Sequence, residues 1–235
     1  MNIYCISDLH LDLTGKKPMN VFGPVWNNYL EEIEADWNNK VKDDDIVLIS
    51  GDISWAMTLE EFKSDLVYLN TLKGQKVLNR GNHDYWWNSI TQIRNILPKG
   101  FYAVQNDCLR FGNILICGTR GWDLPERDEK PDETTKKMLD REKQRMVIAL
   151  NCMQKMRTEQ DKVIYMIHYP PFNSTREQNE FLTLLEEYKV DIVVYGHLHG
   201  KHIRATLQEE RNGIKFYLTA CDQVNNKLVT ILENV

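Results

Sequence analysis

The stretch VLNRGNHD at residues 77–84 shows how this sequence is organised, because a short apolar run leads directly into Gly, Asn, His and Asp. The same arrangement occurs four more times, as CISDLH (5–10), VLISGD (47–52), YMIH (165–168) and VVYGHLH (193–199). Short apolar runs bounded by Gly and acids predict buried strands. In open α/β sheets the functional groups gather at the carboxyl ends of the strands, so we expect these polar side chains to converge on one place.

Helices and further strands are predicted between and beyond these runs. The helices are expected within 25–37, after the capping box Thr58–Glu61 with an end near Gly74, around Met146–Met153, and after Ser174 as N-cap. Further strands are expected at 101–104, 114–117, 215–218 and 228–232. Strands that alternate with helices predict an α/β fold with a largely parallel or mixed sheet covered on both faces.

Composition narrows the classes of protein that this sequence can represent. The chain has 235 residues, enough for one α/β domain (1–235), and its formal net charge of −5 disfavours a passive nucleic-acid binder. Its 5 cysteines show no C-x-x-C spacing, which argues against a zinc ribbon or a disulfide framework. A strand begins at Ile3 without a signal peptide, and no apolar run approaches the roughly 20 residues of a membrane span. We therefore expect a soluble, cytoplasmic protein.

The polar side chains at the strand ends suit a metal site. Five of the 6 histidines lie there, together with carboxylates and an amide, and no cysteine is among them. Such nitrogen and oxygen ligands suit Mn²⁺, Fe and Zn²⁺. The remaining histidine, His202, lies just past the last motif and is expected at the surface.

Taken together, the strand ends carry five motifs in order: Asp8-x-His10, Gly51-Asp52, Gly81-Asn82-His83-Asp84, His168 and Gly196-His197-x-His199. In this set and order the sequence resembles the calcineurin-like metallophosphoesterases, and no metal-ligand position of the family pattern is missing. The resemblance implies a four-layer α/β/β/α sandwich, in which two mixed β-sheets are flanked by helices. It also implies a metal-dependent phosphoesterase with two divalent metal ions (Mn, Fe or Zn, with Mn favoured).

The resemblance further implies a role for each motif residue. The first ion would be bound by Asp8, His10, Asp52 and His199. The second would be bound by Asp52, Asn82, His168 and His197, with the Asp52 carboxylate bridging the pair, and a hydroxide shared by the ions would attack phosphorus in line. His83 would be the general acid for the leaving oxygen or a donor to the phosphoryl group, with Asp84 orienting its ring. The alternative for His83 is a supporting hydrogen bond without proton transfer.

Substrate-binding residues are expected beside these ligands. Asn82 and His83 would contact the phosphoryl group, whereas Arg80 either touches phosphate or lies in a solvated loop. Three tryptophans that follow ligand motifs either line a substrate pocket or pack in the core: Trp55, Trp86 and Trp87.

The charged stretch 118–140 is predicted to be an irregular insertion near the active site and the place where specificity lies. Its residues Arg120, Trp122 and Arg127 combine guanidinium groups with an aromatic plane, a mixture that can hold phosphate and stack a base. The alternative is a charged, solvated loop.

The leading functional hypothesis is hydrolysis of a small phosphomonoester or phosphodiester, with nucleotides among the candidate substrates. A catalytically silent, protein-binding scaffold of the same fold is the alternative, although such scaffolds usually lack ligands or the histidine of the Gly-Asn-His-Asp motif. A nuclease subunit would favour a basic groove or an added nucleic-acid domain, and the sequence shows neither. The physiological substrate, the native metal and the oligomeric state are left open by the sequence.

Overall fold

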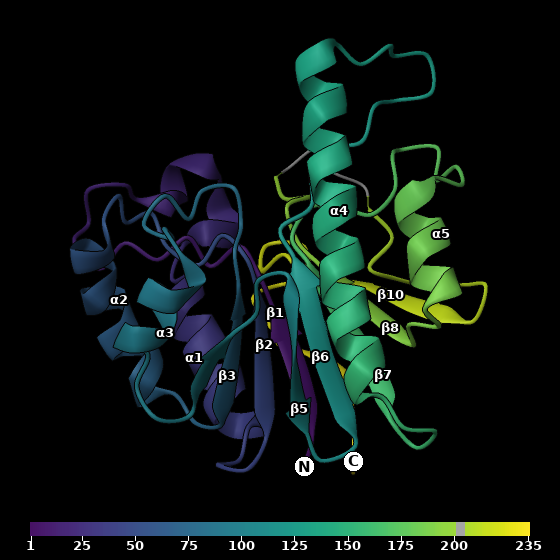
Figure 1. Ribbon diagram of the computed structural model, residues 1–235. Helices are drawn as coiled ribbons and strands as arrows, with labels where there is room; N and C mark the ends of the chain where they lie inside the picture. The colour runs from purple at the N-terminus through teal and green to yellow at the C-terminus, as the bar shows by residue number, and fades with distance from the viewer. Residues whose placement is uncertain (201–204) are drawn as a thin grey trace.

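Two β-sheets pack face to face in the computed structural model, which describes residues 1–200 and 205–235 (Figure 1). The first sheet has the strand order β11 (Val229–Leu232), β1 (Ile3–Ile6), β2 (Ile46–Ser50), β3 (Gln75–Asn79) and β4 (Phe101–Ala103). Strands β1 to β4 run parallel to one another, and β11 is antiparallel to β1. The carboxyl ends of the four parallel strands therefore lie at one edge of this sheet.

The second sheet is also mixed. Its strand order is β5 (Asp107–Phe111), β6 (Ile114–Thr119), β7 (Lys162–Ile167), β8 (Ile192–Tyr195), β10 (Ile214–Leu218) and β9 (Gln208–Arg211). The inner strands β6, β7, β8 and β10 are parallel, and the edge strands β5 and β9 are antiparallel to their neighbours. In Figure 1 the parallel strands of both sheets end toward the top of the view, so the segments that follow them begin on the same side of the molecule.

Helices cover the outer face of each sheet. The first sheet is covered by η1 (Met19–Phe22), η2 (Pro24–Trp26), α1 (Tyr29–Lys40), α2 (Leu59–Thr71) and α3 (Ile90–Ile96), and the second by α4 (Glu133–Met156) and α5 (Glu180–Glu187). The predicted α/β fold, a four-layer sandwich with two mixed sheets between helical layers, is confirmed.

Alternating side chains of the strands build this layering. In β2, Ile46 and Leu48 contribute to the core between the two sheets, whereas Val47 and Ile49 face the helices of the first layer. The partners of Leu48 in the central core include Ile164 of β7 in the second sheet. Strands that are buried on both faces need a continuous apolar run, which is why each of them could be found from the sequence.

Two predicted segments differ from the observed elements. The helix expected within 25–37 begins only at Tyr29, because the 3₁₀ helix η2 occupies the residues before it. The stretch 118–140 is not irregular throughout: its first two residues complete β6, and α4 begins at Glu133 with Asp132 as N-cap. The α4 residues up to 140 escaped detection because they are charged and lie before the apolar stripe of the helix.

The predicted N-cap Ser174 was also wrong. Helix α5 begins at Glu180, and its N-cap is Asn179, whose Oδ1 accepts hydrogen bonds from Phe181 N (2.9 Å) and Leu182 N (3.1 Å). By contrast, Thr58 is the N-cap of α2 as predicted, because Glu61 N donates to Thr58 Oγ1 at 3.2 Å. The second half of the capping box is shifted by one residue, since the Glu61 carboxylate accepts from Met57 N (2.8 Å).

No helix within the described residues combines the length and the apolar character needed to cross a bilayer.

Candidate metal centre

Sharp backbone turns directly after the strands bring the predicted ligands together. Asp8, His10, Asp52 and His197 all have positive φ angles, at 57°, 45°, 50° and 69°. Such left-handed conformations are unfavourable for residues other than glycine and cluster at functional sites. Backbone hydrogen bonds hold two of these turns in place, from Asp8 N to Gly51 O (3.0 Å) and from His10 N to Asp52 O (3.0 Å). The strands β1 and β2 thereby present their polar side chains to the same space.

A first group of ligand-type atoms comes from four residues. Asp8, His10, Asp52 and His199 each offer one ligand atom, and these atoms all lie within 4.8 Å of one another. Both ring nitrogens of His10 and the Oδ2 atom of Asp52 are buried without a hydrogen-bond partner among the described residues. Unpartnered buried polar atoms are costly unless something else satisfies them. Neutral imidazole and carboxylate at this spacing fit a divalent cation.

A second group lies next to the first. The amide oxygen Oδ1 of Asn82 is 2.9 Å from His168 Nε2 and 3.0 Å from His197 Nδ1. Asp52 Oδ2 makes no well-formed hydrogen bond, yet it lies 3.3 Å from His168 Nε2 and 3.8 Å from His10 Nε2. This one oxygen therefore stands between the two groups, where a bridging carboxylate is expected.

Neighbouring groups orient the ligands. His168 Nδ1 donates to Ser50 O (3.0 Å), which turns Nε2 toward Asn82 Oδ1 (2.9 Å). Burial lowers the pKa of this ring, but the carboxylates of Asp52 and Asp8 outweigh burial and raise the pKa to about 9, so Nε2 also carries a proton; a metal ion would take the place of that proton. Both carboxylate oxygens of Asp8 accept from His197 N at 3.1 Å, which ties the end of β1 to the turn after β8. These contacts join the two sheets at the site.

Burial and the neighbouring charges have opposite effects on the pKa values of these candidate ligands. Burial lowers the pKa of His10 to about 3, so that its ring is neutral and available as a ligand. Burial would raise the pKa of Asp52, but the neighbouring His168 and His10 hold it below its usual range. The Asp52 carboxylate is therefore ionised at neutral pH, as a metal ligand must be.

Glycines allow the loops to approach the ligands closely. A Cβ atom at Gly81 would lie 2.1 Å from Asp52 Oδ1, and one at Gly196 would lie 2.4 Å from Asp8 Oδ2. Side chains at these positions would displace the carboxylates, so the Gly-Asn-His-Asp and Gly-His-x-His motifs require glycine for steric reasons.

His83 lies at the edge of the first group. Its ring is 5.5 Å from that of His10 and 4.7 Å from that of Trp55, measured between centroids, and its backbone N donates to Asp52 Oδ1 at 2.8 Å. The ring is partly exposed, and its Nδ1 atom is buried without a partner in the described part of the chain. Burial lowers the pKa of this imidazole below its ordinary value.

Asp84 does not hydrogen-bond to the His83 ring, so the expectation that it orients this ring by direct contact is wrong. Its fully buried carboxylate accepts hydrogen bonds from four donors instead: Gly81 N (2.7 Å), Ile53 N (2.9 Å), Trp86 Nε1 (3.1 Å) and Ser54 N (3.2 Å). The residue thus links the turn after β2 to the turn after β3.

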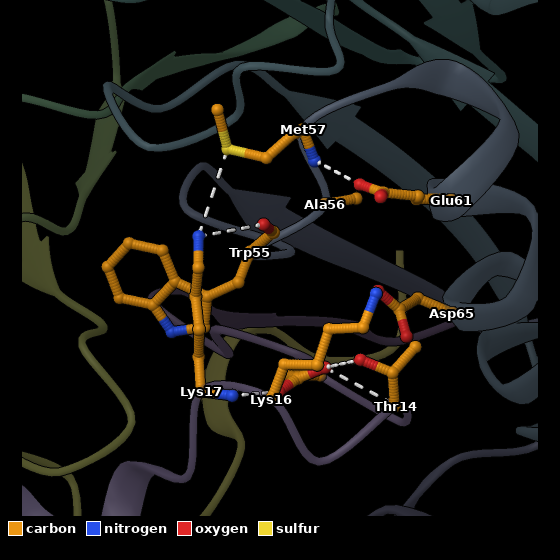
Figure 2. A pocket seen from close by; sticks show the side chains of 9 residues that line it. Thr14, Lys16, Lys17, Trp55, Ala56, Met57, Glu61 and Asp65 are labelled. Carbon is orange, nitrogen blue, oxygen red and sulfur yellow. Dashed lines mark hydrogen bonds between the residues drawn. The ribbon is translucent and has the colours of Figure 1, made fainter.

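Only one of the three tryptophans borders the site. Trp55 stacks on His10 with ring centroids 4.6 Å apart and planes inclined by 19°. Figure 2 shows Lys17 extended alongside this indole, with its Nζ 5.0 Å from the ring centroid, in a cavity of about 80 Å³. Trp86 and Trp87 are buried in the core instead, where Trp86 stacks on Phe62.

The predicted substrate-binding arginines do not lie together: two of them line a cavity, and the third lies on the exposed surface. Arg80 and Arg120 line one polar cavity, and the Arg120 guanidinium lies 4.9 Å from the ring centroid of Trp122. Arg127 is exposed and pairs with Glu177 at 2.9 Å, as the solvated-loop alternative predicted. His202 lies outside the described residues.

Two neighbours of the ligands were missed by sequence reasoning. Asp123 Oδ1 lies 3.4 Å from His197 Nε2, and the ring of Tyr169 lies 4.2 Å from that of His197. Tyr169 directly follows His168, which was an available clue. Asp123 is one of many acids in a charged stretch, and nothing in its spacing distinguishes it.

Comparison with known proteins agrees with this geometry. The sequence profile of the calcineurin-like phosphoesterase family matches residues 1–201, and the chain belongs to this family. Among curated proteins it is similar to uncharacterized metallophosphoesterases from two strains of Helicobacter pylori, with 26% identity over 188 and 206 residues. These matches cover 79% and 86% of this chain but 43% and 45% of the relatives, so the chain spans less than half their length.

Solved structures support the fold alone. A Thermus thermophilus protein is 12% identical, with a TM-score of 0.58 over 98% of this chain and 97% of its own. Phosphopantetheinyl hydrolase from Mycobacterium tuberculosis is 16% identical, with a TM-score of 0.55 over 99% of this chain and 96% of its own.

Proposed function

We propose that this chain hydrolyses a phosphomonoester or phosphodiester of a small molecule at two divalent metal ions, with Mn²⁺ favoured over Fe and Zn²⁺. The position of Asp52 carries the proposal. Its Oδ2 atom lies 3.8 Å from His10 Nε2 and 3.3 Å from His168 Nε2, between the two groups of ligand-type atoms. A single carboxylate so placed can contact two ions at once, which is the arrangement of a two-metal hydrolase.

The chain's own residues would hold the ions and orient the ester. Asp8, His10 and His199 complete the first site with Asp52, and Asn82, His168 and His197 complete the second. When bound, two such ions supply an activated water and neutralise the charge of the phosphoryl group. The protein's task is then mainly positioning, because in-line displacement at phosphorus depends on geometry and charge stabilisation.

His83 would act on the phosphoryl group or on the leaving oxygen. Burial lowers the pKa of its ring, which favours the neutral form as a hydrogen-bond donor. The negative charge of a bound ester acts in the opposite direction and favours the imidazolium that is needed to protonate a leaving alkoxide. Either role requires that one ring nitrogen reaches the substrate, and the partly exposed position of His83 permits this.

The test is hydrolysis of p-nitrophenyl phosphate and bis(p-nitrophenyl) phosphate by metal-stripped protein with Mn²⁺, Fe²⁺ or Zn²⁺ added back. Asp52→Asn removes the bridging charge, and Asp132→Asn is the matched control, because it makes the same chemical change at the exposed N-cap of α4. Asparagine is also a good N-cap, so the control leaves the helix intact.

Turnover that requires metal, persists in Asp132→Asn and disappears in Asp52→Asn supports the proposal, and the preferred reagent distinguishes monoester from diester. Two bound ions without turnover of any phosphate ester would contradict it and favour a protein-binding scaffold.

A further inference from the structure

A second group of charged residues lies next to the metal centre without sharing its ligands. Three arginines, Arg80, Arg120 and Arg145, line one cavity of about 120 Å³. The other lining residues are Asn79, Gln105, Asn106, Met138 and Glu142. Arg80 follows β3, Arg120 follows β6, and Arg145 comes from the middle of α4, so the cavity depends on the packing of α4 against the second sheet.

The Nε atoms of two of these arginines lack hydrogen-bond partners. Within residues 1–200 and 205–235, the Nε atoms of Arg80 and Arg120 are buried and have no hydrogen-bond partner. Arg145 pairs with Glu142 three residues earlier on α4, and its side chain remains 42% exposed. A buried N–H group without an acceptor is costly, so these two Nε atoms favour the arrival of an oxygen-rich anion.

One carboxylate partly compensates the charge. Glu142 is fully buried, and its Oε1 atom accepts from Arg145, whereas its Oε2 atom has no partner among the described residues. Asp84 also attracts the Arg80 guanidinium, so three guanidinium groups face two carboxyl groups and at least one positive charge is left uncompensated. Burial and the charge of Arg120 lower the pKa of Arg80, which shows that these groups repel each other.

The uncharged polar residues that line this cavity add a hydrogen-bond donor. The side-chain oxygen of Gln105 already accepts from Trp87 Nε1 at 2.7 Å, so its NH₂ group is the one that remains for a ligand. Guanidinium groups bind phosphate oxygens through paired hydrogen bonds, and an amide NH₂ can add a third contact.

The cavity is joined to the metal centre through the backbone. Arg80 immediately precedes Gly81, whose Cα lies against Asp52, and the carbonyl oxygen of Arg120 accepts from His168 N (3.0 Å) and Tyr169 N (3.1 Å). Arg80 and Arg120 are thus carried by two loops that also carry or hold candidate metal ligands.

We propose that Arg80, Arg120 and Arg145 bind a second phosphate group, so that the preferred substrate carries one phosphate at the metal centre and another in this cavity. The substrate assignment rests on the proposed function, whereas the anion site itself does not. The same chemistry would also hold free inorganic phosphate, and the test separates these two sources. A cavity that holds only water is the result that would overturn the proposal.

The first measurement is calorimetric titration of the metal-loaded protein with inorganic phosphate. We expect two phosphate ions per wild-type chain and loss of one binding event in Arg145→Met. The matched control is Arg141→Ala, an exposed arginine one turn earlier on the same helix, which should keep both events. If Arg145→Met binds phosphate with the same stoichiometry and affinity as the wild type, the anion site does not exist.

A second variant guards against misfolding, because Arg145→Met leaves Glu142 without its partner. Arg145→Lys keeps a positive charge near Glu142 but loses the forked donor geometry. We expect it to weaken the second phosphate event by roughly 10-fold, at the lower end of what a charged hydrogen bond contributes. Unchanged affinity in a folded Arg145→Lys protein would count against the proposal.

The second measurement compares two substrates that differ by one phosphate, adenosine 5′-monophosphate and adenosine 3′,5′-bisphosphate. We expect wild type and Arg141→Ala to prefer the bisphosphate in kcat/KM by roughly 10- to 100-fold, and Arg145→Met to lose this preference through a higher KM. If the substrates are equivalent in every protein but phosphate stoichiometry still falls in Arg145→Met, the site binds free phosphate.

The two proposals fail in different ways. Metal-loaded protein that hydrolyses no phosphate ester contradicts the proposed function, and the phosphate titration still decides whether the arginine site binds an anion. Turnover with unchanged phosphate binding and an unchanged substrate ratio in Arg145→Met overturns the second site alone.

Discussion

Asp52 Oδ2 lies 3.3 Å from His168 Nε2, although Asp52 follows β2 of the first sheet and His168 follows β7 of the second. The pair marks the point at which the two sheets meet at their carboxyl ends. It also places a carboxylate from one sheet among histidines from the other, so the ligand groups exist only where both sheets are packed together.

Asp52→Asn should reduce the metal content of both sites, because an amide oxygen carries no charge and cannot bridge two cations equally well. We expect activity to fall by more than the roughly 10- to 100-fold that loss of an outer-shell partner costs. Metal stoichiometry by mass spectrometry, measured alongside Asp132→Asn, checks this. Two ions retained at wild-type affinity would show that Asp52 bridges nothing.

His83→Gln should lower kcat by roughly 10²- to 10⁴-fold, the usual contribution of a positioned acid or donor, while the metal content stays at the wild-type value. Glutamine keeps a hydrogen-bond donor, so a small loss of kcat would indicate that His83 donates to the phosphoryl group. A large loss of kcat would indicate that His83 transfers a proton. Loss of metal together with activity would instead identify His83 as a ligand.

Lys76→Met should remove a pH dependence from the stability of the protein. Lys76 is buried, which lowers the pKa of its ammonium group from 10.5 to about 8. Between these two values the unfolded chain binds the proton and the folded chain does not, so wild-type stability rises with pH there. We expect a rise of about 1–3 kcal/mol relative to the variant, measured by urea unfolding.

The control for that comparison is Lys99→Met, an exposed lysine in the turn before β4. Its unfolding free energy should follow the wild-type pH profile. A wild-type profile that matches Lys76→Met would mean that the buried ammonium group is solvated better than its burial suggests.

Asn179→Ala should destabilise the protein by about 1 kcal/mol, because Asn179 caps α5 through two backbone N–H groups. Ser174→Ala should change the free energy of unfolding by less than about 0.5 kcal/mol, as is usual for an exposed position. Thermal or urea unfolding of both variants checks this prediction. A larger loss of stability in Ser174→Ala than in Asn179→Ala would contradict the assignment of Asn179 as the N-cap.

The buried strands and the polar residues that follow them could be predicted because one physical cause produces both. A strand covered on two faces must be apolar throughout, so the polar residue at its end stands out, as His168 does after β7. The edge strand β9 has no such signature: its sequence is QEER, and its side chains are mostly solvated, as is common for edges that must resist further pairing.

Contacts that depend on how distant elements pack could not be predicted. Arg145 lies among charged residues of α4, and only the packing of that helix on the second sheet brings it to Arg80 and Arg120. Asp84 was recognised as part of a motif, but its four donors come from two loops whose approach no local pattern reveals.

The division of the ligands between two sheets has a consequence for how the protein is made. Asp8, His10, Asp52 and Asn82 leave the ribosome early, whereas His168, His197 and His199 come from the second sheet, more than eighty residues later. The early residues alone offer two carboxylates, one imidazole and an amide, and neither of the two proposed metal sites is complete among them. We therefore expect metal uptake to follow synthesis of the turn after β8, so that a nascent chain shorter than this holds neither ion.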